Sequence, residues 1–184
     1  MNKLIIAIAL MLSVFAMAQQ EEKLPYYEIL EHAESYTAGA VASRMVDGLG
    51  FRYYWATEGL RPEDLNYKPS ESGRTSGETI DHILGLSNFL LNSISTEKSR
   101  GEDKALSFED KRKQTLLNLK AASDILRNAD DLSQFDNERF PFWNLINGPI
   151  ADALWHCGQV VLLRRASGNP FNSKVSVFSG KLRE

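Results

Sequence analysis

The segment TSGETIDHILGLSNFLL, residues Thr75–Leu91, decides the fold class, because it carries the main signals of an amphipathic helix. Thr75 and Glu78 have the spacing of a capping box, in which each side chain accepts a hydrogen bond from the other residue's backbone amide. Apolar residues then recur at intervals of three and four, which is typical of one buried helix face. That face consists of Ile80, Ile83, Leu84, Ser87, Leu90, Leu91 and Ile94. We therefore expect a helix from Thr75 to about Ser95.

A second segment, NGPIADALWHCGQVVLLRRASGNP (Asn147–Pro170), predicts the last helix of the chain. Pro149 suits the first turn of a helix, where its missing amide hydrogen is not needed. Gly168 is a natural C-terminal stop, and the proline that follows prevents continuation. The helix is therefore expected to begin at Asn147–Pro149 and to end near Ala166.

Two further helices are expected, over Tyr27–Gly59 and Ser107–Asn128. Gly48 and Gly50 interrupt the first, which is therefore predicted as one helix or as two pieces. Ser107 is a plausible N-cap for the second. The apolar positions at helical spacing are Ala38, Val41, Met45 and Leu49 in the first, and Leu116, Leu119, Ala122, Ser123 and Leu126 in the second.

The remaining segments connect these helices. Leu60–Leu65 is expected as a turn and a short helical piece, with Pro62 in its first turn. Residues 128–147 have little periodicity and are rich in aromatic residues, which either plug one end of the core or wall a pocket. Residues 174–184 are expected as a short extended tail, without a convincing strand pair. The sequence thus predicts an all-α four-helix bundle with an aromatic-rich connection before the last helix.

Residues 1–18 have the pattern of a secretory signal peptide. Lys3 supplies a positive start, Leu4–Phe15 is apolar but short for a membrane span, and Ala16–Ala18 forms a small-x-small cleavage site. The alternative is an uncleaved N-terminal anchor. We expect cleavage, export to the periplasm or the exterior, and a single domain over residues 19–184 with no membrane contact.

Composition excludes some functions. The formal net charge is −3, and it becomes −4 once Lys3 leaves with the signal, so no electrostatic footprint for nucleic acid is present. Cys157 is the single cysteine, which excludes an intramolecular disulfide, and we expect it to be a buried apolar residue. A small-molecule ligand or substrate and a homodimer are both compatible with this composition.

Three residues are candidate metal ligands. Asp152 and His156 lie one turn apart and share a face of the last helix, and His82 on the Thr75 helix could meet them inside a bundle. Two imidazoles and a carboxylate suit a divalent ion such as Zn²⁺, Ni²⁺, Fe²⁺ or Mn²⁺. The alternative is structural, with His82 bonded to a carbonyl or to Glu78 and Asp152 favoured by the helix dipole. His32 has no comparable neighbours and is expected at the surface.

Two stretches resemble the DinB-like (damage-inducible) four-helix-bundle superfamily. In LRPEDLNYKPSESGRTSGETIDHILGLSNF (residues 60–89), Glu78 and His82 match the Glu-x-x-x-His that opens the family's second helix. In ADALWHCGQVVLLRRASGNP (residues 151–170), His156 and Gln159 match its His-x-x-Gln motif, followed by arginines and a glycine. Together the two stretches cover about a third of the chain.

The resemblance implies a function but does not fix one. Members of the superfamily commonly bind a divalent metal through three histidines, one on the second helix and two on the last; His82 and His156 match two of them, and Asp152 stands at the third. Some relatives are thiol-dependent transferases or isomerases, an analogy that export weakens because reduced thiol cofactors belong to the cytoplasm. The expectation is a metal-dependent hydrolase or transferase with a mononuclear site. The alternative is a non-catalytic bundle that binds a small molecule or a partner without metal.

Overall fold

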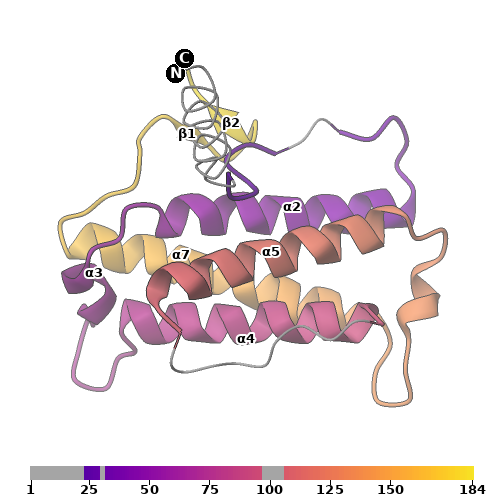
Figure 1. The fold of residues 1–184 in the computed structure, drawn as a ribbon, viewed down its shortest axis with the longest axis horizontal. Coiled ribbons are helices and arrows are strands. Elements are labelled where there is room, and N and C mark those ends of the chain that lie inside the picture. Colours follow the sequence, from indigo (N-terminus) through magenta and orange to yellow (C-terminus); the bar gives the residue numbers. More distant parts are fainter. Residues whose placement is uncertain (1–22, 30–31, 97–105) are drawn as a thin grey trace, which may run out of the picture.

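The computed structural model of the protein describes residues 23–29, 32–96 and 106–184, and this part of the chain is mostly helical. Its long helices are α2 (Ala38–Thr57), α4 (Ser76–Ile94), α5 (Phe108–Arg127) and α7 (Ala151–Ala166). Helices α2 and α4 each pack against both α5 and α7, so the four helices surround one hydrophobic core (Figure 1). The all-α prediction is confirmed. None of the described helices is long and apolar enough to cross a bilayer. The expected signal peptide and the charged linker at 97–104 lie outside the described residues.

Helix α4 forms as its sequence predicts. The Thr75 hydroxyl accepts a hydrogen bond from the Glu78 amide at 3.1 Å, and the Glu78 carboxylate accepts one from the Thr75 amide at 2.8 Å, which closes the capping box. All seven residues of the expected apolar face are buried. Helix α5 agrees equally well, because Ser107 is its N-cap, Asn128 is its C-cap and the five expected face residues are buried.

Helix α2 differs from the prediction at its N-terminal end and on its buried face. It begins at Ala38, where the Thr37 hydroxyl caps it by accepting a hydrogen bond from the Ala40 amide at 3.1 Å. The prediction of helix over Tyr27–Thr37 was therefore wrong for the described residues 27–29 and 32–37. The buried face includes Ala42, Val46, Leu49 and Tyr53, whereas Val41 of the expected face is 47% exposed.

The two glycines expected to interrupt α2 lie inside one continuous helix. A Cβ atom at Gly50 would lie 2.4 Å from the ring of Tyr26, so the glycine lets that ring pack directly on the helix backbone. Tyr26 is 7% exposed and its hydroxyl donates a hydrogen bond to Asp47 at 3.3 Å. Gly50 is thus explained by a close contact with a distant residue, and not by a helix break.

Helix α3 (Pro62–Asn66) confirms the expected short helical piece, and it is fixed to the end of α7. The buried Asp64 carboxylate accepts hydrogen bonds from Arg61, Ser167 and Asn169 at 2.6–2.9 Å. Arg164, which is 2% exposed, donates to the backbone carbonyls of residues 55, 56 and 58 at the end of α2. These polar contacts join α2 and α3 to the C-terminal end of α7.

The aromatic connection is a plug with short helical turns. It contains a 3-10 helix η1 (Leu132–Phe135), the single turn α6 (Trp143–Leu145) and a π-helical segment η2 (Ile146–Ile150) that leads into α7. Phe142 is buried in the core, and two neighbouring aromatic residues, Phe135 and Phe140, pack partly buried against it.

The start of the last helix also differs from the prediction. Helical turns precede Pro149, which lies inside η2 and not at a first turn. Gly148 has non-helical angles there (φ −80°, ψ −105°), and the kink accommodates the proline, which cannot donate a backbone hydrogen bond. The chain therefore enters α7 through the distorted η2 segment, which ends at Ile150, directly before Ala151.

The expected extended tail is a small antiparallel hairpin of β1 (Val175–Ser176) and β2 (Lys181–Leu182), so the expectation of no strand pair was wrong. The Ile29 amide donates a hydrogen bond to the Gly180 carbonyl at 2.9 Å, which ties the hairpin to the N-terminal segment. Val175 packs with Ile29, Phe51 and Trp55 in a second, smaller hydrophobic cluster. The hairpin lies beside α2, on the side away from α4 (Figure 1).

Candidate metal centre

The three expected ligands meet between α4 and α7. His82 Nε2 lies 3.2 Å from Asp152 Oδ2, although the two residues are 70 positions apart in the sequence. The imidazole rings of His82 and His156 lie 4.6 Å apart between centroids and are nearly perpendicular. The prediction that these two rings approach one another across the two helices is therefore confirmed.

Asp152 stands between the two histidines. Its second oxygen, Oδ1, lies 3.4 Å from His156 Nε2, as expected for two residues one turn apart on α7. The His156 side chain is 12% exposed, and those of Asp152 and His82 are 32% and 37% exposed. The carboxylate thus holds the pair together, while solvent and small solutes can reach the site.

Gln159 orients His156 from the opposite side of the ring. Its Oε1 lies 2.9 Å from His156 Nδ1, within hydrogen-bond distance. In the tautomer that carries its hydrogen on Nδ1, the Gln159 oxygen accepts that hydrogen, and the lone pair of Nε2 is on the side of the Asp152 carboxylate. This is the tautomer in which Nε2 and the carboxylate could ligate one metal ion.

Glu78 takes no part in orienting His82. Its carboxylate is engaged by Thr75 in the capping box, and the backbone hydrogen bond from Thr75 lowers the pKa of Glu78. In the structural alternative His82 was bonded to a carbonyl or to Glu78, but the structure pairs Glu78 with Thr75 at the N-terminus of α4.

The chemistry of the donor set fits a divalent ion. The structure places one ligand atom from each of the three side chains within 4.8 Å of the others. Donors on one zinc ion each lie about 2.0–2.2 Å from it, so they must be within roughly 4 Å of one another.

A cleft of about 500 Å³ opens beside the two histidines. Its polar lining consists of Arg74, Thr79, His82, His156 and Gln159, and Pro69 and two leucines of α7 complete it. Arg74, in the loop before α4, and Thr79, three residues before His82, were not singled out from the sequence. The spacing of Thr79 and His82 on one helix face was the signal for Thr79, whereas Arg74 carries no local signal.

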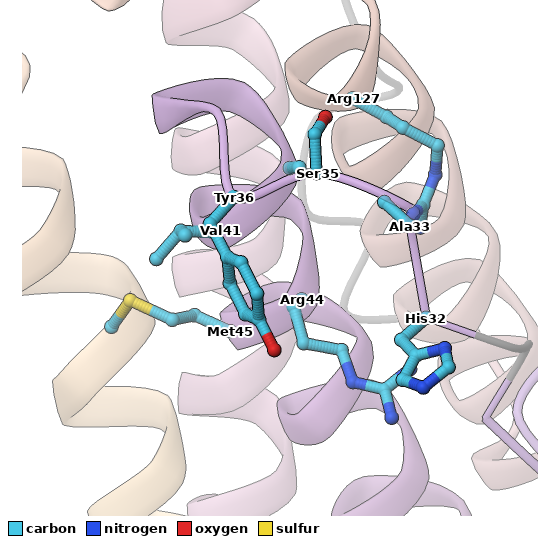
Figure 2. A pocket seen from close by; sticks show the side chains of 9 residues that line it. His32, Ala33, Ser35, Tyr36, Val41, Arg44, Met45 and Arg127 are labelled. Atoms are coloured by element: carbon cyan, nitrogen blue, oxygen red, sulfur yellow. The ribbon is translucent and has the colours of Figure 1, made fainter.

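Two other residues singled out from the sequence lie where they were expected. Cys157 is 2% exposed, and burial raises the pKa of its thiol to about 12. His32 is exposed, and it lines a separate surface pocket with Tyr36, Arg44 and Met45 (Figure 2). Neither residue belongs to the metal centre.

Comparisons with protein-family models, with curated proteins and with solved structures found no match to this chain.

Proposed function

We propose that the protein is an exported, DinB-like four-helix-bundle protein that binds one divalent metal ion through His82, Asp152 and His156. One observation carries the proposal: two imidazoles and a carboxylate from helices distant in sequence converge beside an open cleft. The order of the ligands supports the resemblance, because one lies on the second long helix and two lie one turn apart on the last.

Each residue of the centre has a distinct part in holding the ion. His82 and His156 offer neutral nitrogen donors, and Asp152 offers a charged oxygen that offsets half of the ion's charge. Gln159 keeps the Nδ1 hydrogen on His156, so that Nε2 remains the donor. This donor set occurs in catalytic zinc sites and in non-haem iron sites, which keep open coordination positions.

The proposed activity is hydrolysis or group transfer on a small molecule in the cleft. A divalent ion held in this way supplies Lewis acidity to a substrate oxygen or to water. The chain itself supplies the positive charge of Arg74 for an anionic group and the apolar surface of Leu162 and Leu163 for a carbon skeleton. A buried thiol plays no part, because Cys157 is protonated and enclosed.

A second candidate function is a non-catalytic module whose polar trio is a hydrogen-bond network. The 3.2 Å contact between His82 and Asp152 favours it, because this pair forms a complete hydrogen bond without an ion. In this case the cleft would bind a small molecule and carry out no reaction.

Elemental analysis of protein purified without a chelating tag separates the two functions. If the protein binds metal, we expect close to one equivalent of Zn²⁺, Ni²⁺, Fe²⁺ or Mn²⁺ per chain. The ion should be retained on gel filtration and lost in His156→Ala. His32→Ala is the matched control, because it removes an exposed histidine outside the centre. A metal content below about a tenth of an equivalent, unchanged after each ion is added, would favour the hydrogen-bond network without metal.

A further inference from the structure

A second cavity, of about 250 Å³, lies on the other side of α7, between α2 and the chain that leads into the C-terminal hairpin. It is slightly smaller than ordinary ligand pockets of roughly 300–1,000 Å³. Its walls are mainly apolar and include Trp55, Leu154, Val161, Phe171, Val175 and Val177. No carboxylate is among the residues that line it.

Two arginines, Arg52 from α2 and Arg165 from α7, line the same cavity. Arg52 donates a hydrogen bond to the Gly48 carbonyl one turn earlier in its own helix, at 2.9 Å. The Arg165 guanidinium lies over the Phe171 ring at 5.3 Å from its centroid. Within the described residues neither arginine pairs with an acidic side chain, so two positive charges border an apolar space without a counter-charge.

Gly158 gives independent support for a ligand at this position. It lies in the middle of α7, where glycine is less favourable than alanine. A Cβ atom there would have no neighbour within 4 Å, so packing does not require the glycine. The residue lines the cavity, and its missing side chain keeps that space open.

We propose that this cavity binds a small amphipathic carboxylic acid, with its carboxylate at one of the two bordering arginines, Arg52 or Arg165, and its apolar chain against Trp55 and Val161. The apolar walls accept the chain, and an arginine at the border of the cavity accepts the carboxylate, for which the guanidinium has matching donors. Binding is non-covalent, because the thiol of Cys157 in the lining is buried and protonated at neutral pH.

Isothermal titration calorimetry with octanoate, and with octanamide as the uncharged analogue, tests the proposal. Octanoate is expected to bind about tenfold or more tightly than octanamide, and the double variant R52Q/R165Q is expected to remove that preference, since the charge-assisted hydrogen bonds are lost. Gly158→Leu should abolish binding of both compounds by filling the cavity. Arg139→Gln, an exposed arginine outside the cavity, is the matched control.

Three results would contradict binding of a carboxylic acid in this cavity. No octanoate binding to the wild type, equal binding of octanoate and octanamide, or full octanoate affinity in Gly158→Leu would each overturn the proposal. Circular dichroism and a thermal melt establish that Gly158→Leu is folded. If that variant does not fold, R52Q/R165Q decides alone, and unchanged octanoate affinity in this double variant also overturns the proposal.

Discussion

Metal should stabilise the native protein if the centre forms only in the folded state. A ligand that binds the native state alone contributes about 2.7 kcal/mol at a concentration one hundred times its dissociation constant. For a chain of 184 residues, each kcal/mol raises the melting temperature by about 2–4 °C, which predicts a rise of about 5–11 °C. The donors come from α4 and α7, so separation of these helices on unfolding disperses them.

His156→Ala is the decisive perturbation, because this residue is the least exposed of the three donors. It should abolish the rise with metal. In the absence of metal it should cost only about 1 kcal/mol, because Asp152 and Gln159 are partly exposed and water can replace the lost partner. Asp152→His should keep or increase the rise with Zn²⁺, since imidazole is a good zinc ligand.

Thermal melts of the wild type, the two variants and His32→Ala, each with metal and with chelator, provide the measurement. His32→Ala should melt and respond to metal as the wild type does. A wild-type melting temperature that no ion changes would refute the reasoning. So would a loss of more than about 3 kcal/mol in metal-free His156→Ala, which would show the trio to be a structural network.

Three other predictions concern the scaffold. Arg164→Met should lower the free energy of unfolding by roughly 3–5 kcal/mol in urea melts, because it leaves the buried carbonyls at the end of α2 without a donor; Arg139→Met, at an exposed arginine, is the surface control. Hydrogen bonds from Arg61, Ser167 and Asn169 lower the pKa of Asp64, so its contribution is present above the unfolded value of about 4 and is lost as pH falls below it. Asp64→Asn should therefore be less stable than the wild type at pH 7, and the two should converge in acid melts. Cys157 should react with a thiol reagent only after denaturant is added, because its thiol is buried and has a pKa of about 12; rapid labelling of the native protein would contradict this.

The sequence predicts best the features that depend on neighbouring residues. The caps of α4 and α5 and their apolar faces follow from local spacing, and they are confirmed in full. Helix α2 was less well predicted because its boundaries and glycines depend on distant contacts. The close approach of the Tyr26 ring explains the glycine at position 50, and no local sequence pattern near either residue predicts that contact. The predicted helix start at Pro149 was wrong for a similar reason. A proline usually lies in the first turn of a helix, but here it lies inside a π-helical segment.

The candidate site shows the same division between local and distant information. The spacing of Asp152 and His156 follows from one helical turn, and that of Gln159 follows from the next. The approach of His82 depends on which helices are neighbours, and it could be anticipated only from the expected packing of the helices. Arg74 belongs to the loop that precedes α4, so spacing within α4 could not reveal it.

Helix α7 explains how one element can serve two different sites. Residues 152, 156, 159 and 163 form one stripe along it, and residues 154, 158, 161 and 165 form a second stripe with the same spacing. The stripes are offset by two residues, which is about 200° around the helix, so they face nearly opposite directions. The first stripe meets α4 at the candidate metal centre and its cleft, and the second borders the apolar cavity. Buried Ala153, Cys157 and Val160 lie between them and fix the helix in the core, which holds both faces in place.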